Sequence, residues 1–459
     1  MSYEHWRYVL RVRALLAGDV NGTIPAANLK KHDSDSCMNK MRYSLAYGSG
    51  QLSVDVDAFG NTHEVAPKSA IAVPNLDSEV VAALERPSGA DPPTESLSDS
   101  STIALVVDES SRMCPARALL ESALSYLRAY GFGPPNVVIF AAHRVGSVHQ
   151  ESEINRQLGD PISRGYTLVI HNPDDLDSVS NIGETSTFHT PLEVNRFLLQ
   201  AHYRIGLGAI MPDPFVGATG GGMSVIPGVS GRKTILRNMK LRVSPECGPL
   251  DTSCPASVDI LEASCLAGLD FVLNTVPDWK GSVARVVGGD PSAAWHEGVK
   301  TSSVLSSATI SRLADVVLVS AGGDPFDRTL YDAVDCLHAA LQCSRLNGAI
   351  VLVAECAQGI GPIGFRKSLL ATKSEKDVTV TAKKQFEIGM EKSRLFRRVT
   401  DTRRLVICSK LRESFLEEGL ACGLTGSLAE ALETAGHDTG SRSNMTLLPK
   451  GVATVIRGI

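Results

Sequence analysis

The stretch from Ile103 to His143 decides the fold class of this 459-residue chain. It begins with IALVVDESSR (103–112), a short apolar run that ends in acidic and hydroxyl residues. The helix-like ARALLESALSYLRAYG (116–131) and the strand-like NVVIFAAH (136–143) follow it. A short continuous apolar run is typical of a parallel strand that is buried on both faces. Strand, helix and strand in succession favour a right-handed βαβ unit and a parallel sheet.

The same alternation continues along most of the chain. Strand-like runs recur in YTLVIHN (166–172), HYRIGLGAI (202–210), ADVVLVSAGGDP (314–325) and AIVLVAECAQG (349–359), with helix-like segments between them. A chain of this length is longer than a domain with a single hydrophobic core usually is. We therefore predict an α/β protein of two domains with mostly parallel sheets. The predicted divisions are an N-terminal extension (1–47), a first domain (48–258) and a second domain (259–459).

Composition and charge exclude several classes of protein. The chain has 45 Lys and Arg against 50 Asp and Glu, a net charge of −5, so no overall positive field attracts nucleic acid or an anionic membrane. No apolar run reaches the roughly 18 residues that a membrane span needs. The N-terminus also lacks the pattern of a secretory signal. We expect a cytoplasmic protein with a small-molecule partner, and leave homo-oligomerisation open.

The ten cysteines are scattered and include no Cys-x-x-Cys pair. This spacing favours free structural thiols over zinc ligands or disulfides, as expected in a reducing compartment. A second local feature is the segment 366–404, which has 12 Lys and Arg against five Asp and Glu. Because aromatic residues are too sparse in it for bases to stack on, we interpret it as a solvated helical face.

Four polar residues follow predicted strands and are candidates for a site: Asp108, Arg112, His143 and Asp213. In parallel sheets, ligands bind at the carboxyl ends of the strands. Arg112 could hold a carboxylate bidentately, and His143 could act as a general base. The alternative is structural: an Asp or Ser helix cap, an Arg paired with a neighbouring acid, and a satisfied histidine.

Two glycine-rich turns add further candidates. Residues 211–239 hold six glycines within fifteen positions, where backbone N–H groups could cradle an anion. The candidate anion- or substrate-binding residues are Asp108, Ser111, Gly220, Gly221, Gly222, Ser224 and Tyr331. The turn SAGGDPFDRTLYDAV (320–334) could bring Tyr331 to face the first domain. The alternatives are a strained surface loop for the first turn and a capped helix start for the second.

The strings IALVVDESSRMCP, IFAAHRVGSVHQESEINRQLG and IGLGAIMPDPFVGATGGGMSVIPGVSGRKTILRNM together resemble the lactate racemase (LarA-type) family. The resemblance runs in order from about Gln51 to Ile363. It implies a two-domain α/β isomerase that racemises or epimerises 2-hydroxy acids in an interdomain cleft. It also implies a nickel–pincer nucleotide, tethered to a lysine, that accepts the α-hydride between two acid/base histidines.

The substrate-handling positions of the family are partly kept. Arg112 matches the arginine of the family's Asp-x-x-x-Arg-x-x-Pro loop, and His143 matches its first histidine. Its second histidine falls on Asp213. A desolvated Asp213 would have a raised pKa and could act as an acid.

The positions that hold the cofactor in the family differ more strongly. The tethering lysine falls on Met223, the nickel-ligating histidine falls on Met239, and a lysine of a Leu-Tyr-x-x-x-Lys helix falls near Asp335. A thioether cannot form a thioamide, and it is a poorer nickel(II) ligand than imidazole. Asp335 would repel a phosphate where a lysine attracts one. We therefore expect no metal site and no nickel-pincer cofactor.

The sequence thus favours a lactate-racemase-fold isomerase or lyase that does acid/base chemistry next to a carboxylate or carbonyl. His143, Asp213 and Arg112 are its predicted catalytic residues, and a small hydroxy- or oxo-carboxylate is its predicted substrate. Two alternatives stay open. One is a divergent nickel-pincer racemase or epimerase, and the other is a catalytically silent protein that binds a metabolite or a partner.

Overall fold

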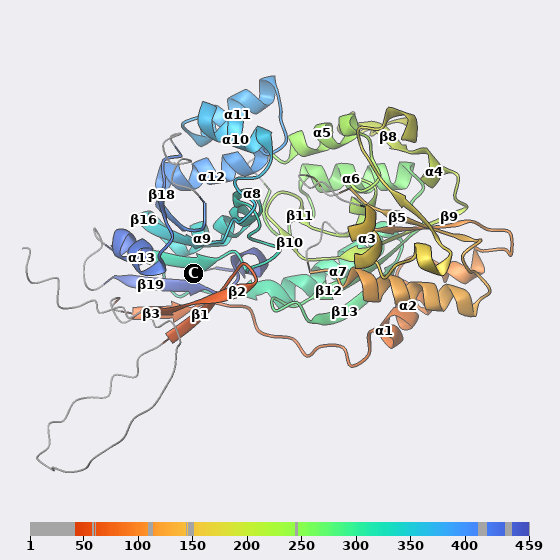
Figure 1. Ribbon diagram of the computed structural model, residues 1–459, viewed down its shortest axis with the longest axis horizontal. Coiled ribbons are helices and arrows are strands. Elements are labelled where there is room, and N and C mark those ends of the chain that lie inside the picture. The colour runs from red at the N-terminus through yellow and green to blue at the C-terminus, as the bar shows by residue number, and fades with distance from the viewer. Residues whose placement is uncertain are drawn as a thin grey trace, which may run out of the picture.

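The computed structural model describes residues 42–56, 59, 61–108, 113–143, 145, 151–243, 247–411, 420–436 and 443–458. The chain forms two lobes side by side, each built on a six-stranded sheet (Figure 1). This confirms the predicted α/β class with mostly parallel sheets. Residues 1–41 of the predicted N-terminal extension lie outside the described residues.

The first sheet has the strand order β13-β12-β9-β4-β5-β6, in which β13 alone is antiparallel to its neighbour. The strands are β4 (Ile103–Val107), β5 (Val137–Ala141), β6 (Thr167–Ile170), β9 (Tyr203–Ala209), β12 (Phe271–Pro277) and β13 (Val283–Gly289). The apolar runs form strands here because both faces of the sheet are covered. Leu105 packs into one core cluster and its neighbour Val106 into the other.

Two helical layers cover this sheet. One contains α1 (Leu76–Glu85), α2 (Ala116–Ala129) and α3 (Glu151–Gln157). The other contains α4 (Arg196–Leu199), α5 (Arg232–Leu241), α6 (Pro255–Leu266) and α7 (Pro291–Ser306). Gly131 has φ 92° directly after α2, as expected for a glycine that ends a helix.

The second sheet has the order β18-β17-β16-β15-β19-β3, and all its pairs are parallel. Its strands are β3 (Asn61–Glu64), β15 (Ala314–Ser320), β16 (Ser344–Val353), β17 (Arg404–Cys408), β18 (Gly423–Thr425) and β19 (Asn444–Leu448). The helices of this lobe are α8 (Leu330–Ala333), α9 (Leu337–Cys343), α10 (Ile363–Ala371), α11 (Glu375–Lys384), α12 (Met390–Thr402) and α13 (Leu428–Gly436).

Four short strand pairs complete the described part of the fold. They are β1 (Arg42–Tyr47) with β2 (Gly50–Asp55), β7 (Val179–Glu184) with β8 (Pro191–Asn195), β10 (Pro212–Asp213) with β11 (Gly217–Ala218), and β14 (Ser307–Ala308) with β20 (Val455–Ile456). The β1–β2 hairpin packs Leu45 and Val54 against the second sheet. The β10–β11 hairpin belongs to the first lobe but inserts Phe215 into the core of the second.

The sheets divide the chain differently from the predicted boundary at 258/259. Strand β12 pairs in parallel with β9, so the helix–strand unit that follows residue 258 continues the first sheet. Conversely, β3 joins the second sheet by pairing with β19. The first lobe therefore extends through α7, and the segment before α1 belongs largely to the second lobe. Hydrophobic periodicity identifies a strand but carries no information about which sheet the strand joins.

The structure corrects the expectation that all cysteines are free. Cys247 and Cys254 form a disulfide across seven residues of sequence, with their Cα atoms 5.1 Å apart. The pair closes the connection between α5 and α6, and a turn inside this loop brings the two sulfurs together. Seven described cysteines are free, four of them buried in the second lobe.

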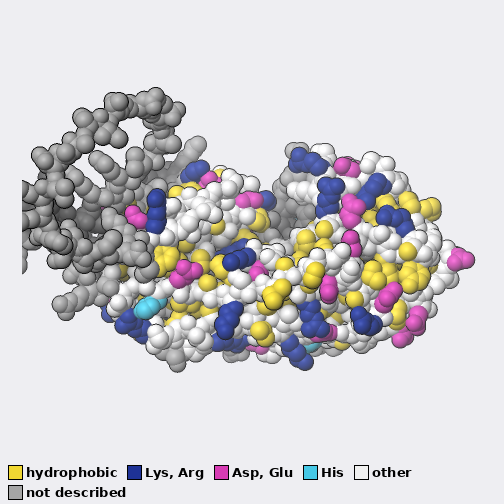
Figure 2. Space-filling model, turned by 90° about the horizontal axis from the view of Figure 1, so that it is seen from below, with side chains coloured by type: hydrophobic (Ala, Val, Ile, Leu, Met, Phe, Trp, Pro, Cys, Tyr) yellow, Lys and Arg dark blue, Asp and Glu magenta, His cyan; other side chains and the backbone are white. Residues whose placement is uncertain are grey.

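Two further expectations concern the distribution of surface charge and the presence of membrane-spanning helices. On the face that Figure 2 shows, acidic and basic side chains are interspersed. Within the part of the chain that the structure describes, no helix combines the length and the hydropathy required to cross a bilayer.

Candidate active site

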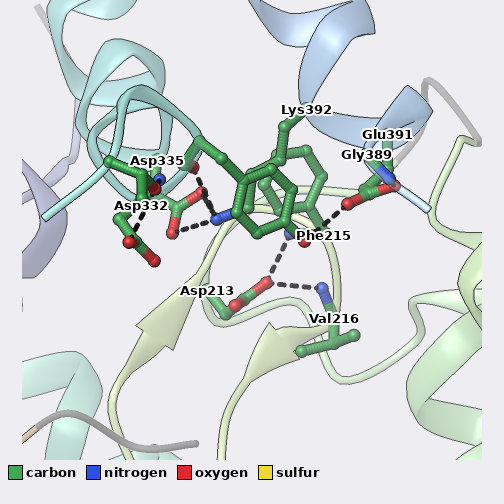
Figure 3. Close-up of polar contacts among 10 residues, drawn as sticks. Asp213, Phe215, Val216, Asp332, Asp335, Gly389, Glu391 and Lys392 are labelled. Atoms are coloured by element: carbon green, nitrogen blue, oxygen red, sulfur yellow. Dashed lines mark hydrogen bonds and ion pairs between the residues drawn. The ribbon is translucent and has the colours of Figure 1, made fainter. Parts of the chain in front are cut away.

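The β10–β11 hairpin carries Asp213 to the contact between the two lobes. The Asp213 Oδ1 atom accepts hydrogen bonds from the backbone N–H groups of Phe215 (2.7 Å) and Val216 (2.9 Å). An aspartate that bonds the backbone two and three residues later fixes a tight turn. Because this turn holds Asp213 by one oxygen, its carboxylate has a defined orientation beside the second lobe (Figure 3).

A buried lysine from the second lobe faces this hairpin. The Lys392 Nζ atom lies 4.1 Å from the centroid of the Tyr331 ring and 5.9 Å from that of Phe215. It bonds Asp335 through Oδ1 (2.7 Å) and Oδ2 (2.8 Å), and it donates to the Tyr331 carbonyl oxygen at 3.1 Å. The ammonium group therefore joins α8, α12 and the aromatic ring that the first lobe inserts (Figure 3).

Tyr331 and Glu391 form a second buried pair next to this lysine. The Tyr331 hydroxyl donates to Glu391 Oε1 at 2.9 Å, and Glu391 Oε2 accepts the Gly389 N–H at 2.9 Å. Burial raises the pKa of the Tyr331 hydroxyl well above 10.0, and the Glu391 carboxylate raises it further. Burial also raises the pKa of Glu391, against the opposing effects of its hydrogen bonds and of Lys392. The Tyr331 hydroxyl stays protonated and orients the Glu391 carboxyl group.

His338, on α9, is a titratable group that the charge of Asp213 reaches. The pKa of His338 is lowered to about 4, first by burial and then by the positive charges of Arg398 and Arg394. The negative charge of Asp213 acts in the opposite direction. At neutral pH the His338 imidazole is therefore uncharged, and its lowered pKa makes it a weak base.

The remaining strand-end candidates lie in the first lobe. Asp108 is 2% exposed at the end of β4, and a Cβ on Gly208 would lie 3.6 Å from its Cβ and 3.3 Å from Asn274 Nδ2. His143 follows β5 and donates its backbone N–H to Gly228 O at 2.7 Å. The pKa of Asp174 is lowered, chiefly by its hydrogen bond from Arg232 and to a smaller extent by the charge of His143. Ser111 and Arg112 lie outside the described residues.

Asp213 and His143 approach the site from different strands. Asp213 follows β9 and His143 follows β5, and β4 separates these two strands in the sheet. Strands two positions apart are about 10 Å from each other. Their action as an acid/base pair on opposite sides of one substrate stays a prediction.

The predicted anion-binding glycines form the 3₁₀ turn Gly221–Ser224 and the residue before it. The Gly221 N–H donates to Asn274 Oδ1 at 2.8 Å, and Ser224 is buried with its Oγ 3.4 Å from Gly221 O. A Cβ on Gly221 would lie 2.8 Å from Trp295, and one on Gly222 would lie 2.9 Å from Ile260 O. Glycine is required at these two positions because α6 and α7 pack directly on the turn. The Gly221 amide is committed to the protein, which corrects the prediction that it faces an anion.

The two methionines at the family's cofactor positions are part of the protein interior. Met223 is 5% exposed and packs in the core cluster that contains Val225 and Ile260. Met239, on α5, is 1% exposed. The cavity beside Met223 measures about 10 Å³, room for one water at most. Among the described residues, no three His, Cys, Asp or Glu side chains gather as a metal site would require.

Sequence reasoning missed the residues that α12 contributes. The segment 366–404 was interpreted as a solvated face, whereas Glu391, Lys392, Arg394 and Arg397 are all buried. Their partners come from distant parts of the chain, so local charge composition could not reveal them. Asp335 also differs from its expected role. Lys392 neutralises the charge that was expected to repel a phosphate.

Comparisons with known proteins agree with this architecture. Models of the lactate racemase N-terminal and C-terminal domains match residues 47–247 and 310–456. Lactate racemases of Thermoanaerobacterium thermosaccharolyticum and Lactiplantibacillus plantarum are 24% and 25% identical over 90% of this chain, which spans 98% and 99% of their own lengths.

Two solved structures share the fold. The lactate racemase apoprotein from Thermoanaerobacterium thermosaccharolyticum superimposes with a TM-score of 0.78 at 22% identity, covering 91% of this chain and all of that one. A protein from Thermotoga maritima superimposes with a TM-score of 0.62 at 15% identity, covering 85% of this chain and all of that one. At these identities the structures establish the fold alone. The two domain models, which together match most of the sequence, establish that the chain belongs to the lactate racemase family.

Proposed function

We propose that this protein is an isomerase- or lyase-type enzyme that moves a proton next to the carboxylate or carbonyl of a small hydroxy- or oxo-carboxylate. The main support for the proposal is that Met223 and Met239 are buried at the positions where the family binds its cofactor. Titratable groups are nevertheless present at the contact between the lobes. Membership of the family supports an isomerase-type reaction. Because the two methionines do not suit the hydride-accepting cofactor, we assign the reaction to proton transfer rather than hydride transfer.

The residues present do not fit a nickel–pincer nucleotide. Met223 has no amine with which to form a thioamide, and its side chain packs in an apolar core. Met239 offers a buried thioether where nickel(II) prefers imidazole. No step of the proposed reaction therefore passes through that cofactor.

The proposed roles follow from the chemistry of each side chain. His143 acts as general base, and Asp213 exchanges a proton on the opposite side of the substrate. Asp213 is suited to this role because its two backbone hydrogen bonds both use Oδ1 and fix the carboxylate without engaging Oδ2. Arg112 binds the substrate carboxylate. His338, neutral at pH 7, places an uncharged imidazole on the side of the second lobe.

Isotope exchange tests the proposal directly. Purified protein is incubated in D₂O with a panel of small 2-hydroxy and 2-oxo acids, and NMR follows deuterium incorporation at the carbon next to the carboxylate or carbonyl. Proton abstraction places solvent deuterium at that carbon, whereas internal hydride transfer retains the substrate's own hydrogen. We expect Asp213→Asn and His143→Gln each to slow this exchange by about 100-fold or more.

Asp213→Asn is the sharper variant because an asparagine Oδ1 can accept the same two backbone N–H groups, so the hairpin is kept. Metal analysis of the same preparation separates the alternatives. Stoichiometric nickel with retained substrate hydrogen would establish the divergent pincer racemase. Neither exchange nor binding of any acid in the panel would contradict an enzyme of this class and favour a catalytically silent protein.

A further inference from the structure

The connection between α5 and α6 carries a sulfur pair that the proposed acid/base chemistry does not use. Cys247 is only partly buried, whereas its disulfide partner Cys254 is 1% exposed. Cys247 is therefore the more accessible half of the disulfide for a small thiol from solvent. Accessibility of the attacked sulfur is one of the factors that set the rate of thiol–disulfide exchange.

The buried sulfur lies where a negative charge is stabilised. Cys254 is the residue that precedes the first turn of α6, a helix of 12 residues. The helix dipole at such an end favours a thiolate, and here it acts without a capping hydrogen bond, because the Cys254 side chain makes none and Pro255 has no N–H. When a thiol attacks Cys247, Cys254 is the group that leaves, and a stabilised thiolate leaves faster. The pair is thus asymmetric, with an exposed sulfur to attack and a stabilised leaving group.

The loop closed by the disulfide packs on the hairpin that carries Asp213. Leu250 N–H donates to Gly217 O at 2.7 Å. Gly217 has φ 74°, and a Cβ there would lie 2.1 Å from Asp251 O, so no side chain fits between loop and hairpin. Directly after the loop, Ser257 Oγ donates to the carbonyl oxygen of Val216. Val216 is also one of the two residues whose N–H groups hold the Asp213 carboxylate.

The hairpin is therefore held from both sides. Lys392 lies beside its Phe215 from the second lobe, whereas in the first lobe the 247–254 loop supports Gly217 and Ser257 of α6 supports Val216. Opening the disulfide releases a constraint on the loop while leaving the contacts of the second lobe unchanged. Loss of a covalent closure raises the conformational freedom of the segment it closed.

We propose that Cys247 and Cys254 form a reversible redox-modification site, exchanged with small-molecule disulfides of the glutathione type, whose oxidised form fixes the Asp213 hairpin. In oxidation, the Cys247 thiolate attacks one sulfur of the small disulfide and releases one small thiol. The Cys254 thiolate then attacks Cys247 Sγ and releases the second. Both electrons and both thiol protons pass to the two small thiols, and one protein S–S bond forms.

The modification is detected within a single proteolytic peptide. Trypsin cleavage after Arg242 and Lys280 yields residues 243–280, which contain Cys247, Cys254 and Cys265. Reduced full-length protein is treated with oxidised glutathione and alkylated. We expect a peptide lighter by two hydrogen atoms, with Cys265 alone alkylated. Reduced glutathione in excess should restore three alkylated cysteines.

The structural consequence is measured by hydrogen exchange in peptides that cover residues 212–218. Exchange there should be roughly three- to tenfold slower in the oxidised than in the reduced wild-type protein. Cys254→Ser places a hydroxyl group suited to helix capping at the start of α6 and should abolish this difference. Cys265→Ser, which removes an exposed cysteine on the same helix, should preserve it.

This inference does not depend on the proposed enzymatic function, because both readouts are made without a substrate. Three alkylated cysteines after treatment with oxidised glutathione would overturn the modification site. A disulfide that forms without any change in exchange over residues 212–218 would overturn its effect on the hairpin. Persistence of the redox difference in Cys254→Ser would also contradict the assignment.

Discussion

Lys392 holds both carboxylate oxygens of Asp335, at 2.7 and 2.8 Å, although the two residues are 57 positions apart in sequence. Both side chains are largely buried, with 8% of the lysine and 14% of the aspartate exposed. The pair places a positive charge beside the Phe215 ring from the other lobe. A buried charge beside an aromatic ring is tolerated only when an oppositely charged group compensates it.

Lys392→Met should lower the free energy of unfolding by about 3–5 kcal/mol, because it leaves the Asp335 carboxylate buried without its cation. Urea unfolding followed by circular dichroism measures the loss. The double variant Lys392→Met/Asp335→Leu should recover much of it, since removing both charges also removes the desolvation cost. As a control, Lys367→Ala breaks a pair with Glu387 in which the lysine is 64% and the glutamate 37% exposed, and it should cost less than about 1 kcal/mol. Equal losses for the two single variants would contradict the buried-pair account.

Glu391 gives the stability of the protein a distinct pH dependence. Burial raises the pKa of Glu391 in the folded state above its ordinary value of 4.5. The folded state therefore retains this proton to higher pH than the unfolded state, and stability falls as pH rises above about 4.5. Relative to Glu391→Gln, the free energy of unfolding of the wild type should decrease across that range, by at most about 1.4 kcal/mol per pH unit.

Urea unfolding at a series of pH values measures the difference between the two proteins. Glu433→Gln, which replaces an exposed carboxylate on α13, is the matched control and should follow the wild type. A constant difference between wild type and Glu391→Gln at all pH values would show that the Glu391 carboxyl group does not resist ionisation.

Local pattern accounts for most of the strands of the first sheet. Apolar runs that are bounded by turn residues predict β4, β5 and β9, because each strand is buried on both faces and its burial needs no particular partner. The same pattern misplaces β12, since nothing in an apolar run states which sheet it joins. The parallel pairing of β9 with β12 joins strands that are separated in sequence by α5 and α6, so it is fixed by tertiary contacts.

Local sequence marks residues that lie near strand ends or glycine turns, whereas residues that depend on distant partners carry no local signal. Asp213 lies in β10 and Tyr331 in α8, each close to a glycine-rich turn, so sequence alone singles them out as candidates, and their roles in the site stay predictions. Lys392 looks like any lysine of a charged helix until Asp335 is placed against it. The bond between Cys247 and Cys254 is hidden for a related reason, because a spacing of seven has no motif and the turn at Leu250 brings the sulfurs together.

Met223→Lys tests whether the position of the family's tethering lysine still opens onto a ligand site. Met223 is 5% exposed among apolar side chains, so a lysine there must bury its ammonium group or distort the glycine turn. The free energy of unfolding should fall by more than about 3 kcal/mol. Met223→Leu conserves volume and should cost less than about 1.5 kcal/mol. If the lysine variant is as stable as the leucine variant, the side chain reaches solvent and the misfit to the pincer cofactor must be reconsidered.

Titration of His338 tests whether the two lobes meet as described. Its imidazole should titrate near pH 4, observed by NMR of protein labelled with ¹³C-histidine and assigned by its absence in His338→Gln. Asp213→Asn should lower the pKa of His338 further, because it removes a negative charge contributed by the other lobe. Arg398→Met should raise it, because it removes a positive charge. Opposite shifts in the two variants require both charges to lie close to the imidazole at once. A His338 pKa that is indifferent to Asp213→Asn but responsive to Arg398→Met would mean that the hairpin lies away from α9 in solution.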